Sequence, residues 1–216
     1  MQTRGKDSAA LAPVPAALNR LAPTARRLIE ATIAAIDAGG EGAVRVQDVA
    51  DAAGVKIPVL YRHFANRDDL LEVAQIERLN QALNRELAEI AAAVATVESA
   101  SQFRRLFDLI LASLASPERR AARWRRVNII GSTYGRPTLA AGVAALQASA
   151  VAGIASVLQR PLESGWLRAG LDLDAFSAWF AGQTLGRIII ELGDSPIDES
   201  AWNTISADAV RHVLFG

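Results

Sequence analysis

Residues 45–64 read RVQDVADAAGVKIPVLYRHF, and this stretch decides the fold. Its first half repeats apolar residues at i, i+3, i+4 and i+7, the spacing that places side chains on one face of a helix. These residues are Val46, Val49, Ala50 and Ala53. Gly54 follows at once, where a helix needs a residue that tolerates positive φ in order to end. The pattern predicts a short helix that closes at Gly54 and turns.

A second short helix is predicted from about Lys56 to His63. Pro58 falls in its first turn, where a missing N–H breaks no intrahelical hydrogen bond. Leu60 and Phe64 are four residues apart and face inward, so the other side chains stay on the outer side. A bare helix of this size fits the major groove of DNA. Helix–glycine–helix alone also describes an ordinary helical hairpin with a half-buried Tyr and His.

The wider string is more specific. Gly54-Val55 is followed by LYRHF at residues 60–64 and by a helix capped at Asn66, and RLIEATIAAIDAGGEGAVRVQDVA precedes it at residues 27–50. Over residues 24–72 the chain closely resembles the DNA-binding domain of the TetR family of transcriptional regulators. The resemblance implies an all-α protein. It would have an N-terminal three-helix helix-turn-helix domain and a C-terminal helical bundle for ligand binding and dimerisation.

The motif departs from the family pattern at two places. Arg45 stands where the family usually has Ser or Thr to cap the first helix of the motif. Lys56, Ile57, Pro58 and Val59 stand where it usually has a start similar to Ser-Lys-Gly-Thr. The reading surface is therefore unusually apolar, and we expect contacts with thymine methyl groups in place of bidentate hydrogen bonds.

The predicted DNA-binding residues fall into two groups. Those that face the base edges are Lys56, Ile57, Pro58 and Val59. Those expected to contact phosphates are Arg45, Gln47, Tyr61, His63 and Arg67. Arg62 lies on the same exposed side of the helix and completes the set.

Composition and charge exclude several classes of function. The 216 residues have a formal net charge of zero, and residues 20–67 hold seven Lys or Arg against five acids, an excess that a dimer would double. The absence of cysteine excludes disulfides and thiol chemistry. Neither His63 nor His212 belongs to a catalytic motif. The sequence therefore predicts no catalytic residue, no metal site and no cofactor.

Three segments are predicted along the chain. Residues 1–22 form a disordered arm, either a simple tail or an additional DNA contact. Its basic residues are Arg4, Lys6 and Arg20. Residues 23–70 form the DNA-binding domain, whose first helix is capped by Thr24. Residues 71–216 form the effector-binding and dimerisation domain.

We expect a cytoplasmic protein without a membrane partner. No apolar run is expected to approach the ~18 residues that a membrane span needs. The start, MQTRGKDSAA, lacks the apolar core of a signal peptide.

The C-terminal part carries two features that suggest a ligand. Residues 118–126 contain five arginines, which fit a solvated surface, a second DNA-backbone patch or an attractor for an anionic effector: Arg119, Arg120, Arg123, Arg125 and Arg126. The resemblance implies an effector pocket, although aromatic residues at helical spacing also describe a plain core. The candidate ligand-binding residues are Phe103, Phe107, Trp124, Asn128, Tyr134, Trp179 and Gln183.

The last two long helices are predicted over residues 176–192 and 198–214. Ala178, Gly182 and Gly186 repeat every four residues and leave a smooth groove that a partner helix can approach. By resemblance, these helices would form a four-helix interface in a homodimer. Packing within a single chain is the alternative.

The sequence thus predicts a TetR-type repressor that binds a near-palindromic double-stranded operator as a dimer. A small-molecule effector would release it. The alternative is a helical small-molecule sensor without sequence-specific DNA binding.

Overall fold

The computed structural model describes residues 21–193 and 197–216, and in these ranges the chain forms helices and turns with no strand. The all-α prediction is confirmed. The chain divides into two compact units, Met1–Glu77 and Arg78–Gly216. Most of the predicted arm at residues 1–22, including all three of its basic residues, lies outside the described residues.

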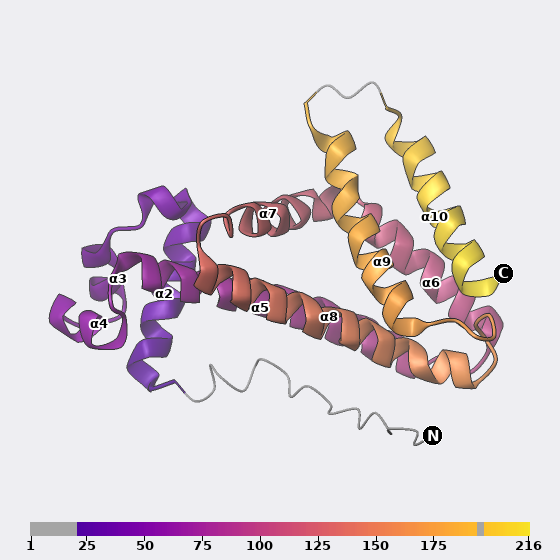
Figure 1. Ribbon diagram of the computed structural model, residues 1–216, viewed down its shortest axis with the longest axis horizontal. Helices are drawn as coiled ribbons and strands as arrows, with labels where there is room; N and C mark the ends of the chain where they lie inside the picture. The colour runs from indigo at the N-terminus through magenta and orange to yellow at the C-terminus, as the bar shows by residue number, and fades with distance from the viewer. Residues whose placement is uncertain (1–20, 194–196) are drawn as a thin grey trace, which may run out of the picture. The chain divides into compact units, whose positions relative to one another are not determined.

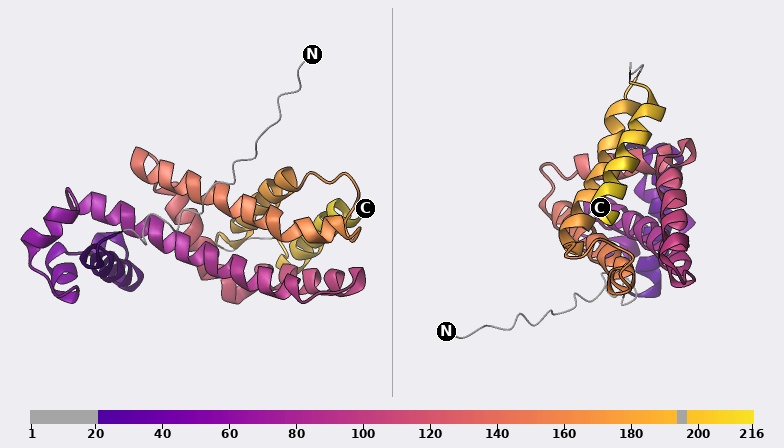
Figure 2. Two further views of the ribbon diagram at one scale, coloured as in Figure 1. Left: turned by 90° about the horizontal axis from the view of Figure 1, so that it is seen from below. Right: turned by 90° about the vertical axis from the view of Figure 1, so that its right-hand side faces the viewer.

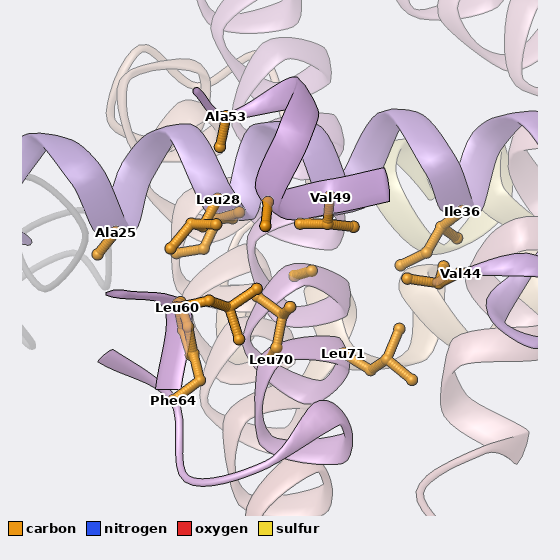
Figure 3. Packing of buried hydrophobic residues seen from close by; sticks show 13 residues of the cluster. Ala25, Leu28, Ile36, Val44, Val49, Ala53, Leu60, Phe64, Leu70 and Leu71 are labelled. Atoms are coloured by element: carbon orange, nitrogen blue, oxygen red, sulfur yellow. The ribbon is translucent and has the colours of Figure 1, made fainter. Parts of the chain in front are cut away.

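The N-terminal unit holds three short helices and the start of a long one (Figure 1). In chain order the elements are α2 (Pro23–Gly39), the 3-10 turn η1 (Glu41–Ala43), α3 (Val46–Ala52), α4 (Ile57–His63) and the beginning of α5 (Arg67–Ala95). Their apolar faces meet in one core, where Leu28, Leu60 and Leu70 are completely buried (Figure 3). Each buried leucine contributes about 1.5–3 kcal/mol. This core fixes α4 on the outside of the unit with one face free.

The ends of α2 show how its residues set its length. The helix begins at Pro23 with Ala22 at the N-cap, and no side chain caps its free N–H groups. The predicted Thr24 cap is therefore wrong, because the preset φ of Pro23 favours a start two residues earlier, with Pro23 as the first helical residue. At the other end Gly40 takes φ 75°, and its N–H donates to the carbonyl of Ile36 at 2.8 Å.

Asn66 caps α5, as the sequence predicts. Its Oδ1 accepts a hydrogen bond from the N–H of Asp69 at 2.8 Å, and Asp69 Oδ2 accepts one from the N–H of Ala65 at 2.9 Å. The two bonds satisfy two backbone donors in the manner of a capping box. They fix the angle at which the chain leaves α4 and enters α5.

The C-terminal unit is a helical bundle that continues from α5 (Figures 1 and 2). Its further elements are α6 (Ala100–Ala115), η2 (Pro117–Arg119), α7 (Arg120–Gly131), α8 (Pro137–Glu163), α9 (Leu173–Gly186), η3 (Arg187–Glu191) and α10 (Glu199–Phe215). A cluster of aromatic rings forms the core between α6, α9 and the end of α10; Phe107, for example, lies 6.2 Å from Phe180 and 6.3 Å from Phe215 between ring centroids.

The predicted continuous helix over residues 176–192 is corrected. The α-helix ends at Gly186, and residues 187–191 form a 3-10 turn. Glycine and the β-branched run Ile188–Ile190 both weaken an α-helix. The tighter turn leaves Arg187 and Glu191 buried and paired at 3.2 Å.

One helix, α8, is long and apolar enough to cross a membrane, with 27 residues and a mean hydropathy of 1.7. Residues 137–159 contain no charged side chain, so the statement that no apolar run approaches 18 residues is wrong. The run is easy to overlook in the sequence because it consists largely of the small residues Ala, Gly and Ser. Length and composition are weak evidence for a span. Here α8 packs against α9 and buries Leu139, Leu146 and Leu158 in the bundle.

Candidate DNA interface and effector cavity

The turn between α3 and α4 has a defined backbone geometry. Gly54 takes φ 68°, the Val55 N–H donates to the Ala50 carbonyl at 2.9 Å, and the Gly54 N–H donates to the Asp51 carbonyl at 3.0 Å. These are the two bonds of a Schellman motif, which needs a left-handed residue at this position. Arg27 Nε also donates to the carbonyl of Ala53 at 3.2 Å. The end of α3 is therefore fixed from two sides.

The start of α4 presents a mixed surface. Lys56 and Pro58 are exposed, whereas Ile57 and Val59 are half-buried. Ile57 packs partly against the core of the unit. Of the four residues predicted at base edges, Lys56 and Pro58 thus project freely, and the other two offer only part of their apolar surface.

The second half of α4 exposes three consecutive polar side chains. Tyr61, Arg62 and His63 are all exposed, while Leu60 between them and the turn is completely buried. The tyrosine hydroxyl, the guanidinium and the imidazole are all groups that bind phosphate oxygens. The buried leucine marks the side of α4 that faces the core, and the three polar residues lie away from it.

Two predicted phosphate contacts on α3 have partners inside the protein. Arg45 Nη1 donates to the carbonyl of Gly42 at 2.9 Å. The amide of Gln47 donates to both carboxylate oxygens of Asp51, at 2.9 and 3.0 Å. Both side chains are exposed, so each can reach DNA only by exchanging its present partner.

Arg67 is tied more firmly into its own unit. Its Nη2 donates to the carbonyl of Glu41 at 2.6 Å and its Nε to the carbonyl of Val44 at 3.2 Å. Its third nitrogen lies 3.5 Å from a carboxylate oxygen of Asp68. The sequence suggested a phosphate contact; the structure adds a clamp that joins α5 to the turn before α3.

Charge on the N-terminal unit is local. The described residues 21–77 contain six Lys or Arg and nine Asp or Glu, a difference of −3 before His63 is counted. Residues 52–67, by contrast, contain Lys56, Arg62, Arg67 and His63 and no carboxylate. The turn and α4 are therefore the electropositive part of a unit that is negative as a whole, which favours approach of a polyanion from this side.

A largely apolar cavity of about 160 Å³ lies inside the C-terminal unit, between α5, α6, α7, α8 and α9. Leu87, Ile90, Phe107 and Phe180 are among the side chains that form its apolar wall. Glu86, Arg119, Arg123 and Arg126 line it as charged residues. A second, more polar cavity of about 530 Å³ lies between α6, α9, η3 and α10.

The structure separates the predicted ligand-binding residues. Phe107 lines the apolar cavity and Gln183 the second one. Phe103 is completely buried in the aromatic core, and Trp179 packs on Phe176 with ring centroids 6.0 Å apart. Three others line neither cavity: Trp124 and Asn128 are exposed, and Tyr134 is 95% exposed. Helical spacing predicts which residues share a face, but not which face a neighbouring helix covers.

Most of the arginines at residues 118–126 have internal partners. Arg119 pairs with Glu86 at 2.5 Å, and Arg120 donates to the carbonyl of Glu191 at 2.7 Å. Arg123 pairs with Glu191 and donates to the carbonyl of Leu114 at 2.8 Å. Arg125 is exposed. The glutamate partners lie 33 to 71 residues away in the sequence, so nothing in the local sequence could reveal them.

Among the described residues no group of three or more His, Asp or Glu side chains is placed to hold a metal ion.

A helix-turn-helix whose outer helix is exposed and electropositive, followed by a helical body with an internal cavity, defines a class of DNA-binding regulators. Residues 28–74 match the model of a protein family described as bacterial regulatory proteins, tetR family. Residues 28–74, within the N-terminal unit, therefore carry the DNA-binding domain that this family model describes.

Solved structures share the fold over nearly the whole chain. A TetR-family regulator from Mesorhizobium loti has 18% sequence identity and a TM-score of 0.66, with 89% of this chain and 97% of that one covered. A TetR-family regulator from Rhodococcus sp. has 22% identity and a TM-score of 0.62 (88% and 98% covered). A transcriptional regulator from Saccharomonospora viridis in complex with choline has 20% identity and a TM-score of 0.62 (89% and 97% covered). No curated protein matches the chain.

Proposed function

We propose that this regulator is a cytoplasmic homodimeric repressor that binds a near-palindromic operator. The N-terminal unit of each subunit inserts α4 into the major groove, and the two helices enter successive grooves about one helical turn apart. A small molecule held in the C-terminal unit releases the dimer from DNA.

The observation that carries this proposal is the surface of α4. Its polar residues Tyr61, Arg62 and His63 are exposed over a fully buried Leu60, and no carboxylate lies within residues 52–67. An ordinary helical hairpin has no need of such a surface in a unit that is otherwise acidic. A helix that approaches phosphates needs it, because each nearby carboxylate would repel DNA.

The residues of α4 divide between two tasks. Lys56, Ile57, Pro58 and Val59 face the base edges, where the apolar groups select thymine methyls. Tyr61, Arg62 and His63 bind phosphates and set the register. Arg45, Gln47 and Arg67 are additional phosphate contacts, which require exchange of their present partners.

The dimer is proposed through α9 and α10. Ala178 and Gly182 are exposed along α9, and a Cβ built on Gly182 or Gly186 meets no atom within 4 Å. Ile189 in η3 and Ile205 in α10, at 63% and 71% exposure, leave further apolar surface on this part of the chain. A second copy of α9 and α10 would cover this surface and bring two copies of α4 to one operator.

Release by a ligand requires that the ligand bind the DNA-free state more tightly than the DNA-bound state. The apolar cavity of about 160 Å³ is the proposed site. The regulator from Saccharomonospora viridis with bound choline shows that a protein of this fold holds a small molecule. The identity of the ligand does not carry over, because the lining residues decide it.

The test is binding of the purified full chain to duplex DNA from just upstream of its own gene, by fluorescence anisotropy against excess random-sequence competitor. We expect competitor-resistant binding that weakens steeply as salt rises, since several phosphates are neutralised. Weak binding that is equal for all sequences would contradict the repressor. It would favour the alternative of a small-molecule sensor without specific DNA binding, in which Ile57, Pro58 and Val59 of α4 would contact no bases.

A further inference from the structure

The charged residues of the apolar cavity carry an excess of positive charge. The lining holds Arg119, Arg123 and Arg126 against the single carboxylate of Glu86. Arg119 pairs with Glu86, and Arg123 pairs with Glu191 from η3. Within the described residues, Arg126 has no carboxylate partner of its own. Arg126 therefore has no ion pair of its own and shares the nearby charge of Glu86 with Arg119.

Arg126 is also incompletely hydrogen-bonded. Its Nη2 donates to Oε1 of Gln147 at 2.6 Å, but its Nε is buried and has no partner among the described atoms. Burial lowers the pKa of the Arg126 guanidinium, and the nearby Glu86 carboxylate raises it in part. A buried donor without an acceptor is costly. A carboxylate is the group that satisfies a guanidinium best, because its two oxygens accept two parallel N–H bonds.

The rest of the cavity suits a compact apolar body. Its wall is dominated by Leu87, Ile90, Phe107, Ile154 and Phe180. The volume is about 160 Å³, and a cavity of about 150 Å³ lined by Leu, Ile and Phe takes up benzene. The space therefore fits one six-membered ring or a chain of about six carbons. A long acyl chain does not fit without rearrangement of the bundle.

We propose that the effector is a small amphipathic carboxylate. Its aryl or short aliphatic body fills the apolar cavity, and its carboxylate binds the Arg126 guanidinium. This inference rests on the proposed function only in calling the ligand an effector, since binding itself requires no DNA. Cations such as choline are disfavoured, because they would add positive charge beside an arginine that has no ion pair of its own.

Three ligands with one ring and different charge test the proposal: benzoate, its neutral isostere benzamide, and the cation benzylamine. Calorimetric titration of the full-length protein without DNA measures each affinity, and hexanoate tests the aliphatic body. We expect benzoate to bind about tenfold or more tightly than benzamide, the advantage of a charged over a neutral hydrogen-bond partner. Benzylamine should bind least. Equal affinity for all three, or no binding of benzoate and hexanoate at millimolar concentration, would overturn the proposal.

Substitutions locate the anion. Arg126→Gln should remove the preference for benzoate over benzamide, whereas Arg125→Gln, which alters an exposed neighbour, should preserve it. Gln147→Glu supplies an internal carboxylate to Arg126 and should lower benzoate affinity at least tenfold without loss of folding. This variant keeps the test open if Arg126→Gln does not fold. Retention of the benzoate preference in Gln147→Glu would contradict the assignment of Arg126.

The same titration in the presence of operator DNA distinguishes the two proposals. Benzoate binding that also releases DNA supports both. Benzoate binding with no effect on DNA supports the ligand class but contradicts its role as effector. DNA binding with no affinity for any carboxylate supports the repressor and overturns the ligand class.

Discussion

At the scale of single residues, the DNA-binding side chains differ in how free they are. Tyr61, Arg62 and His63 are exposed at the surface of α4, whereas Arg67 holds two carbonyls of the turn before α3. The sequence placed all four in one set, because residue type and resemblance report chemistry but not existing partners. The structure predicts that substitutions in this set have different effects on stability.

Tyr61→Phe removes one hydroxyl and keeps the ring. We expect the affinity for DNA to fall by about 1.5–3 kcal/mol, the value of a hydrogen bond to a charged group. The loss should be equal for operator and random DNA, because a phosphate contact carries no sequence information. Anisotropy titration of both DNAs measures it. Tyr134→Phe is the control, since that ring is 95% exposed outside the N-terminal unit. A selective loss for the operator would mean that Tyr61 contacts a base.

Arg67→Ala should weaken the protein even without DNA. It removes two hydrogen bonds from a guanidinium to the carbonyls of Glu41 and Val44. We expect the free energy of unfolding to fall by about 1–3 kcal/mol in urea denaturation of the full chain. Arg62→Ala, at an exposed position on the same surface, should change it by less than about 0.5 kcal/mol. Equal stability of the two variants would contradict the clamp.

At the scale of elements, the backbone conformation of the α3–α4 turn decides how α4 is presented. Gly54 has φ 68° and closes α3 with both bonds of a Schellman motif. The spacing of Val46, Val49, Ala50 and Ala53 predicted this helix and its end, since period and glycine are local signals. The 3-10 turn after Gly186 was not predictable in the same way. It depends on Glu191, which also pairs with Arg123, 68 residues away in the sequence, and that contact exists only in the folded bundle.

Gly54→Ala should destabilise the turn. An L-residue in the left-handed region costs roughly 1–2 kcal/mol, so the midpoint of urea unfolding should fall and DNA affinity with it. Gly42→Ala is the matched control, because its position shows no positive φ and a Cβ there meets no atom within 4 Å. Similar effects of the two substitutions would show that the backbone at Gly54 is not the constraint.

Glu191 joins η3 to α7 through buried charges. It is 2% exposed and pairs with both Arg123 and Arg187. Glu191→Ala leaves the buried guanidinium of Arg123 without its carboxylate and that of Arg187 with only Glu199, and we expect a loss of about 3–5 kcal/mol in the free energy of unfolding. Glu199→Ala, which removes a half-exposed partner of Arg187, should cost much less. Urea denaturation of both variants tests whether the buried contacts of Glu191 contribute more to stability than the half-exposed Arg187–Glu199 pair.

At the scale of the whole molecule, the sequence predicts the class of fold far better than the ligand site. The helix-turn-helix depends on local period, a glycine and a cap, all of which can be read from neighbouring residues. The cavity depends on which faces five helices turn toward one another. Phe107 was predicted to line the ligand site because it is aromatic and inward-facing. Arg126 could not be assigned a single role, because only the folded structure shows that its Nε is buried without a hydrogen-bond partner.

Dimerisation through α9 and α10 is testable with one substitution. Gly182→Leu adds a side chain to the exposed small-residue surface, where it meets no atom of its own chain within 4 Å at Cβ. We expect the variant to fold but to sediment as a monomer, with weakened operator binding. Gly131→Leu adds the same bulk at an equally open position on α7 and should remain a dimer. A dimer in the Gly182→Leu variant would move the interface elsewhere.

The most direct test of the central claim is a hydroxyl-radical footprint of the full chain on the DNA that it binds. Two copies of α4 in successive major grooves should protect two patches of backbone related by a two-fold axis, with centres about 10 base pairs apart. Both patches should disappear in the double variant Tyr61→Ala and His63→Ala, which lacks the tyrosine hydroxyl and the imidazole. A single patch, or uniform weak protection along the duplex, would contradict the account.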